Sequence, residues 1–465
     1  MGIVVAGSIA NDLKVGDSVT WIAVGNLLTV VALDPLYGRL SDAFGRRSVL
    51  LVVLSIFLVG ELGSGLVSNL PLMVLFRAMS GVGGGGLLTL PYIIISDITT
   101  LERRGFYFGL LTITLILSNV VGIVGSGALA EYVSWKWVFL SNVPLTLITV
   151  VLAVFCLPLP VPKGSFWDKF KVVDWAGVGL LVSAICLTVL GTNWGGKVYP
   201  WDSPMVLGPL ISAVVLLGIL IYIEGWYVAH PLLPFHMFTH NVICACLSNF
   251  LMGAVWFSYS YYIPLYFEIV HSFNVIDSSY YLLLLMGSAC LFSYGSVTFA
   301  SRFKTYRPLM WAGGCFMLLG TGLMIIITHH TPYYLHIIFI LMTSLGIGLN
   351  QQLVIITAQA GAPSHEVANA TSFISFCLNM GGVVGLALVG AIFNNVLYKN
   401  LSKIPGDINV EHVMSTLSHV NTFPKDLVQP ITEAYNAAFH FVYIGLLPFS
   451  VIALIALVCL KNLKI

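Results

Sequence analysis

Apolar residues run along this chain in long blocks, and polar residues gather in the short stretches between the blocks. A helix of about 20 apolar residues is long enough to cross the hydrocarbon core of a membrane. The alternating pattern typical of transmembrane β-barrels is absent from the sequence. The pattern therefore predicts an all-α membrane protein. The predicted spans are residues 20–40, 48–67, 71–96, 106–130, 137–158, 174–192, 204–227, 241–269, 279–301, 308–328, 333–359, 370–396 and 436–460.

A shorter apolar segment, MGIVVAGSIANDL (1–13), precedes these thirteen blocks. We interpret it as the tail of a truncated first helix, which would bring the total to fourteen.

The composition agrees with this picture and excludes several functions. Hydrophobic residues make up 58% of the chain and charged residues 8%, whereas about a quarter of a soluble protein is charged. The net charge is +1 and no basic run occurs, so we expect no nucleic-acid partner. No phosphate-binding loop is visible, so we expect no nucleotide cofactor. The eight cysteines lie in apolar segments, where we expect small buried side chains, and His236 falls in a loop. Because no cluster of His, Cys and Asp is visible, we predict no metal site.

Lysine and arginine are distributed unevenly between the two sets of loops. Thirteen of them fall in alternate loops and at the C-terminus, and six fall in the opposite loops. Positively charged loops stay on the cytosolic side, so we assign the richer set to that side and refer to it as the basic side. The longest loop, 397–435, lies opposite and contains a possible glycosylation acceptor at Asn400.

A charged stretch, GRLSDAFGRR (38–47), joins the first two predicted spans. A glycine lets another helix approach its backbone, an aspartate can pair with a cation, and arginines can anchor a loop at an anionic membrane surface. The stretch resembles the signature loop of major facilitator transporters. The resemblance implies a major facilitator fold and a gating loop that pairs across two half-bundles. The gating residues implied are Gly38, Asp42, Gly45, Arg46 and Arg47.

A second motif, RAMSGVGGGGLL (77–88), places Arg77 inside the membrane. A lone charge there is costly unless it faces water or a partner, so Arg77 is either a functional cation or half of a structural ion pair. The motif resembles one in the fourth span of the same family, whose arginine is associated with proton coupling. Further stretches resemble the fungal fourteen-span drug–proton antiporter branch, and within it vacuolar basic amino acid transporters. They are residues 96–109, 133–145, 193–204 and 358–373.

The chain departs from the pattern of this branch in two places. In GIVGSG (122–127), Ile123 stands where the antiporter motif has proline, and Ser126 replaces a glycine. Proline would bend that helix, so its absence leaves proton antiport, symport and uniport open. The first span of the family also begins earlier than it does here, so we expect an incomplete N-terminal half.

Acidic residues inside predicted spans are candidate proton or cation sites. Asp34 directly precedes Pro35, which leaves the carbonyl of residue 31 without its helical donor and makes the spot locally polar. Asp34 is therefore either a functional carboxylate or a protonated acid bonded to a neighbouring helix. Glu268 ends an aromatic run, which fits a cavity wall or an interfacial belt equally. We select Asp34 and Glu268 together to supply the negative charge that binds the substrate, and Arg77 to tune protonation. Glu61 is a weaker candidate, and Glu224 is expected to anchor at the membrane interface.

Three consecutive amides, Asn350, Gln351 and Gln352, fall in the middle of a predicted span. Amides at that depth must bond to another helix or line a polar cavity. We select Asn350 and Gln351 to orient the substrate, and we regard Asn379 in the next span as a weaker candidate.

Together these features predict a secondary active transporter, not an enzyme. Its regions are an N-terminal half-bundle (1–158), two inserted helices (159–230) and a C-terminal half-bundle (231–465). The predicted substrate is a small organic cation, with basic amino acids moved across the vacuolar membrane in exchange for protons as the first choice. The alternatives are drug or siderophore efflux at the plasma membrane, or a sensor-like relative that does not transport. We expect the chain to act as a monomer in the lipid bilayer.

Overall fold

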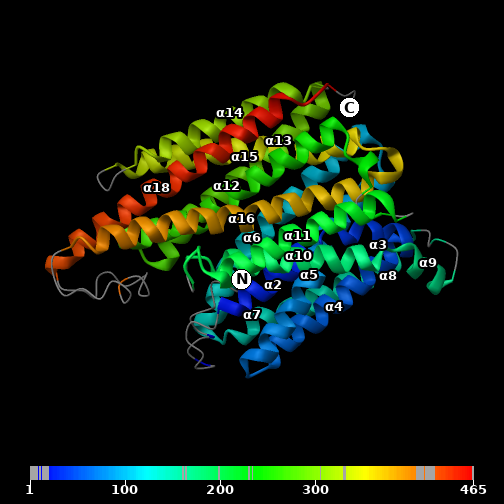
Figure 1. Cartoon of the computed structure of the whole chain (residues 1–465), viewed down its shortest axis with the longest axis horizontal. Helices are drawn as coiled ribbons and strands as arrows, with labels where there is room; N and C mark the ends of the chain where they lie inside the picture. Colours follow the sequence, from blue (N-terminus) through cyan, green and yellow to red (C-terminus); the bar gives the residue numbers. More distant parts are fainter. Residues whose placement is uncertain are drawn as a thin grey trace.

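The computed structural model consists of helices and the loops between them (Figure 1). It describes residues 9, 12, 20–159, 162, 165–196, 199–228, 231–232, 234–303, 305–327, 331–404, 413 and 425–462, apart from a few helix side chains. The long helices are α2 (Thr20–Leu33), α3 (Leu36–Phe44), α4 (Arg46–Leu66), α5 (Leu70–Ile98), α6 (Leu101–Tyr132), α8 (Asn142–Cys156), α10 (Trp175–Trp194), α11 (Pro204–Trp226), α12 (His240–Val270), α13 (Val275–Phe303), α14 (Arg307–Met324), α15 (Tyr333–Gly361), α16 (Val367–Leu401) and α18 (Lys425–Val458). The short elements are α7 (Lys136–Leu140), α9 (Phe166–Val172), η2 (Phe235–Met237) and η3 (Ser364–Glu366).

All thirteen predicted spans fall on helices, which confirms the all-α membrane fold. Among the described residues, ten helical segments are long and apolar enough to cross a membrane, or eleven if the bent pair α2 and α3 is one span. Helices α6 and α14 occupy the other two predicted spans. The proposed first helix lies almost wholly outside the described residues.

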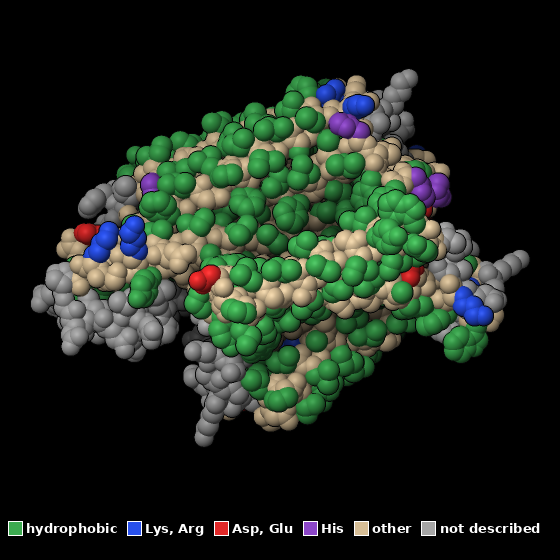
Figure 2. Space-filling view, in the orientation of Figure 1, with side chains coloured by type: hydrophobic (Ala, Val, Ile, Leu, Met, Phe, Trp, Pro, Cys, Tyr) green, Lys and Arg blue, Asp and Glu red, His purple; other side chains and the backbone are tan. Residues whose placement is uncertain are grey.

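The long sides of the bundle carry mainly hydrophobic side chains, as Figure 2 shows for one face. The lysine and arginine side chains visible on that face lie near the two ends of the bundle. The hydrophobic long sides can contact the lipid hydrocarbon chains, and the charged ends can contact the lipid headgroups.

Two groups of helices face each other across the molecule (Figure 1). We call α2–α8 the N-terminal group and α12–α18 the C-terminal group; α10 and α11 pack on each other beside α2. The two groups meet mainly where α6 packs against α13 and where α3 packs against α16. The contacts of Gly105 with Ser301 and of Gly109 with Tyr294 place the start of α6 against the end of α13, which is the basic side.

The first span is broken at Asp34 and Pro35. Helix α2 ends at Leu33, α3 begins at Leu36, and their axes meet at 58°. Pro35 has no N–H to donate to the carbonyl of Val31, so the helical ladder is interrupted there. Asp34 is the residue directly before this break, and its side chain is buried between helices.

Glycines allow two helices of the C-terminal group, α12 and α16, to pack very closely. A Cβ atom added at Gly381 of α16 would overlap the backbone carbonyl of Phe250, and one added at Gly253 of α12 would overlap that of Leu378. Backbone atoms cannot move aside as a flexible side chain can, so α12 and α16 approach this closely only because both positions are glycine.

Replacing Gly381 with alanine should therefore destabilise the protein, by about 1–3 kcal/mol for overpacking. Gly287→Ala is the matched control, because a Cβ there meets no atom within 4 Å and alanine favours a helix. Thermal unfolding of the purified protein in detergent should show a lower Tm for Gly381→Ala and an unchanged or higher Tm for Gly287→Ala. Equal Tm values would contradict the tight contact between α12 and α16.

Candidate functional site

Asp34 connects the two helix groups inside the membrane. Its side chain is fully buried. One carboxylate oxygen accepts a hydrogen bond from Thr89 Oγ of α5 at 3.1 Å, and the other accepts from Asn379 Nδ2 of α16 at 2.6 Å. Among the described residues, no cationic group lies within ion-pairing distance of Asp34. The carboxylate is thus held by one neutral donor from each group, which suits a site that takes up a proton or a cation.

Gln352 makes a second polar contact between the groups. Its Nε2 atom donates to the hydroxyl of Tyr92 at 3.1 Å and to Oγ of Thr112 at 3.0 Å, so α15 is bonded to α5 and α6. The Oε1 atoms of Gln352 and of Gln351 are buried and have no hydrogen-bond partner in the described part of the chain. Buried acceptors of this kind are available to a water molecule or a bound ligand.

Asn350 and Gln351 differ from Gln352 in what they contact. Asn350 donates to the carbonyl of Gly346 on its own helix, and its amide lies where a Cβ of Gly313 on α14 would be. Asn350 thus faces the interior of the C-terminal group. Of the three consecutive amides, the structure brings Gln352 to the N-terminal group, although the sequence analysis selected its two neighbours.

Arg77 belongs to a cluster within the N-terminal group. Its guanidinium pairs with Glu61 of α4 at 3.0 Å, Asn142 of α8 donates to the second oxygen of Glu61 at 2.9 Å, and Ser80 donates to the first. The guanidinium carbon also lies 5.2 Å from the ring centre of Phe139. The cluster joins α4, α5 and α8, and Arg77 precedes Thr89 by about 18 Å along α5.

Two further acids lie away from Asp34. Glu268 is in the last turn of α12 and accepts from Ser278 of α13 at 2.7 Å. It lies about 22 Å along α12 from Gly253, which packs beside Leu378 and therefore near the level of Asn379. The structure does not bring Glu268 and Asp34 together. Glu224 is buried near the end of α11 and accepts from the Leu232 N–H at 3.0 Å, and its position at the membrane interface stays a prediction.

Two residues of α3, Gly38 and Arg39, reach the C-terminal group on the basic side. A Cβ at Gly38 would clash with the backbone of Ala368 and Asn369 at the start of α16. Arg39 donates to the Pro231 carbonyl at 2.7 Å and lies 3.5 Å from the buried carboxylate of Glu366. These contacts hold the first half of α3 against the start of α16 on this side.

The other residues of the predicted gating loop bind within the N-terminal group. Arg46 pairs with Asp42 at 2.5 Å and with Asp97 of α5 at 2.6 Å, and Arg47 donates to the Val154 carbonyl of α8. Gly45 has a φ of 92°, a conformation that other residues rarely adopt, and it makes the turn from α3 to α4.

A third basic-side contact comes from Arg104, which donates to Gln359 of α15 at 3.2 Å and to the Ser96 carbonyl at 2.7 Å. It therefore links the start of α6 to the end of α15. Among the described residues, the contacts of Gly38, Arg39 and Arg104 define what we call the gate.

Sequence reasoning missed three residues of this site, namely Thr89, Tyr92 and Thr112. A threonine or tyrosine in an apolar helix is common, and its spacing along one chain does not show which helix it faces. The motif beginning at Arg77 marked α5 as a functional helix, yet the atoms of α5 that bond to Asp34 and Gln352 lie near or beyond the end of that motif.

Comparison with known proteins supports a transporter. The sequence profile of the Major Facilitator Superfamily matches residues 1–386. The efflux pump dotC of Dothistroma septosporum is 30% identical over 386 residues, which are 83% of this chain and 67% of dotC. Citrate exporter 1 of Yarrowia lipolytica is 28% identical over 98% of this chain and 68% of its own length. The multidrug resistance protein fnx1 of Schizosaccharomyces pombe is 28% identical over 96% of this chain and 85% of its own length. This chain thus spans about two thirds of the length of dotC and of the citrate exporter.

Solved structures share the same fold. The human organic anion transporter MFSD10 superposes with a TM-score of 0.60 at 13% identity, covering 98% of this chain and 88% of that protein. A double tryptophan mutant of XylE superposes with a TM-score of 0.62 at 15% identity, covering 97% and 90%. On the match of the family profile to most of its length, this chain belongs to the Major Facilitator Superfamily and is a multi-pass membrane transporter of small molecules.

Proposed function

We propose that this protein is a proton-coupled transporter of small organic molecules, and that Asp34 is its proton site. The observation that carries the proposal is the position of Asp34, fully buried and bonded to α5 on one side and α16 on the other. When the two helix groups move relative to each other, the hydrogen-bond partners of a carboxylate at their contact change.

Protonation of Asp34 would alter that contact directly. An ionised carboxylate accepts charge-assisted hydrogen bonds, which are stronger than neutral ones. A proton on Asp34 removes its negative charge, so the bond between Asp34 and the Asn379 amide becomes a weaker, neutral one. A weaker bond lets α16 move away from Asp34 more easily, so proton binding and the arrangement of the two groups are coupled.

The gate contacts favour one direction of access. Because Arg39, Gly38 and Arg104 join the two groups on the basic side, we propose that substrate approaches Asp34 and Gln352 from the opposite side in this arrangement. Alternating access then requires that the Arg39–Glu366 and Arg104–Gln359 contacts break, while contacts form at the other end of the bundle.

Two substrate classes are candidates. Export of organic compounds, which we place at the plasma membrane, is supported by the names of the efflux pump dotC, citrate exporter 1 and the multidrug resistance protein fnx1. Movement of basic amino acids across the vacuolar membrane is supported by the motif resemblance and by the negative charge of Asp34, which would attract a cation. Glu268 lies too far along α12 to share a small substrate with Asp34 in this arrangement.

Arg77 takes a structural role in this proposal. Its charge is balanced by Glu61, and the bonds from Ser80 and Asn142 satisfy that carboxylate within the N-terminal group. Arg77 would then keep α4, α5 and α8 together as one rigid body, which is what a rocking motion of the two groups needs.

The proton role of Asp34 can be tested with Asp34→Asn in proteoliposomes. The wild-type protein should move at least one of radiolabelled lysine, arginine, citrate or tetraphenylphosphonium against its gradient when a pH gradient is imposed. Asp34→Asn should lower this pH-driven accumulation by about tenfold or more, because a positioned proton-transfer group typically contributes about 10²–10⁴-fold. Substrate exchange without a pH gradient should persist, because it needs no proton.

Glu268→Gln is the control for this experiment, since it removes the same charge from another membrane helix and should keep pH-driven transport. Accumulation by Asp34→Asn at the wild-type level would remove Asp34 from the mechanism. The compound that is transported decides between the two substrate classes.

The structural role of Arg77 predicts a particular pattern of stability. Glu61→Gln leaves a buried guanidinium without its counter-charge and should cost about 3–5 kcal/mol. Arg77→Gln should cost a similar amount, and the double variant should lose less than the sum of the two. Thermal unfolding in detergent measures all three. Additive losses would show that Glu61 and Arg77 act separately.

A further inference from the structure

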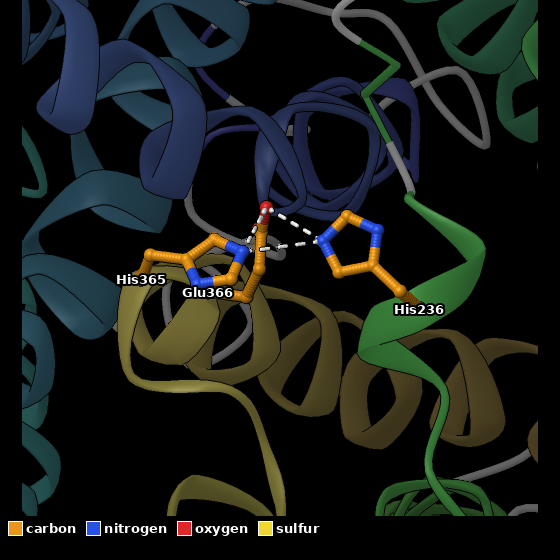
Figure 3. A group of neighbouring side chains, drawn as sticks. All are labelled: His236, His365 and Glu366. Carbon is orange, nitrogen blue, oxygen red and sulfur yellow. Dashed lines mark hydrogen bonds and ion pairs between the residues drawn. The ribbon is translucent and has the colours of Figure 1, made fainter.

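Three potential metal ligands converge on one point at the basic side. The Nε2 atoms of His236 and His365 are 3.4 Å apart, and they lie 3.4 Å and 4.0 Å from the same oxygen, Oε1 of Glu366. Figure 3 shows the three side chains turned toward one another, with His236 carried by one chain segment and His365 and Glu366 by another. The three ligand atoms all lie within 4.8 Å of one another.

This spacing matches the edges of a tetrahedral zinc site. With Zn–N and Zn–O bonds of about 2.0–2.1 Å, two ligands of a tetrahedron lie roughly 3.3 Å apart. Two of the three separations agree with that value, and the third needs only a small rotation of the exposed His365 ring. Two imidazoles and one carboxylate are ligands that Zn²⁺ prefers, and a water molecule would complete the fourth position.

Hydrogen bonding between the histidines explains the arrangement less well. Good hydrogen bonds from nitrogen to an acceptor have distances of about 2.7–3.2 Å, and the two nitrogens exceed that range. If neither nitrogen carries a proton, two lone pairs face each other, and an ion that binds both removes this repulsion.

The site also touches the gate. Arg39 of α3 lies 3.5 Å from Oε1 of Glu366, the oxygen that a metal would take, while Asn369 donates to the other oxygen. A divalent ion on Oε1 would neutralise the carboxylate and repel the guanidinium. Metal binding and the Arg39–Glu366 contact therefore compete for one oxygen.

We infer that His236, His365 and Glu366 form a binding site for a divalent transition-metal ion of the zinc class, and that a bound ion weakens the closed gate by displacing Arg39. The metal would be a regulator held outside the region of Asp34. The binding site is independent of the proposed function, whereas its effect on the gate rests on that function.

Binding can be measured on the full-length protein in detergent, without substrate. Zn²⁺ is titrated by calorimetry, and Co²⁺ is titrated by its visible d–d absorption, which is strong for tetrahedral sites. We expect one ion per chain. His236→Gln and His365→Gln should each lower the affinity by at least about tenfold, the smallest effect typical of residues that shape a metal site.

Two further variants make the test specific. His240→Gln is the matched control, because His240 lies on the same side but bonds to the Cys459 carbonyl, and it should leave the affinity unchanged. Arg39→Gln removes the competing cation and should raise the affinity. Absence of tetrahedral Co²⁺ absorption, or loss of binding in His240→Gln and not in His236→Gln, would overturn the site.

The effect on the gate has its own readout. In the wild-type protein, Zn²⁺ should increase the labelling of a cysteine introduced at Ala368, which α3 covers at Gly38. The increase should be absent in His236→Gln. Zinc binding without a change in labelling would overturn the effect on the gate. This outcome is distinct from a failure of Asp34→Asn to alter transport, which bears only on the proposed function.

Discussion

In the proposed mechanism, the arrangement of the two helix groups depends on the contact between Asp34 and Asn379. A buried carboxylate is costly unless donors surround it, and here the donors come from opposite helix groups. The position of one group relative to the other therefore affects the free energy of the charge, and the charge affects the position of the groups. The carboxylate lies directly before the break at Pro35, where α2 and α3 meet at 58°.

The polar residues of the protein divide into those that hold a group together and those that join the groups. Arg77 with Glu61, and Arg46 with Asp42 and Asp97, bind within the N-terminal group and make it rigid. Contacts that join the two groups are fewer among the described residues and mostly involve neutral donors, as at Asn379 and Gln352. Neutral hydrogen bonds contribute modestly, so the Gln352 contacts can be exchanged during transport at little cost, whereas the Asn379 contact is stronger while Asp34 is ionised.

Glu366 belongs both to the contacts between the groups and to the candidate metal site. It is buried at the start of α16, it faces Arg39 of the other group, and two histidines from separate segments approach the same oxygen. One carboxylate is thereby placed between the gate and a candidate metal site. That position gives the protein a way to respond to an ion that is not transported.

The sequence by itself determined the membrane class, the positions of the helices and the family loop, because apolar length and local motifs are properties of consecutive residues. It also marked Asp34, since an acid before a proline inside an apolar block is visible without coordinates. The tertiary structure decided which of three consecutive amides crosses between the groups, that Arg77 is paired with Glu61, and that Arg39 makes the crossing contact while Arg46 does not. It also brought His236 to His365, residues far apart in the chain. These outcomes depend on how helices are rotated and paired, which is set by packing across the whole bundle and not by the spacing of residues along one segment.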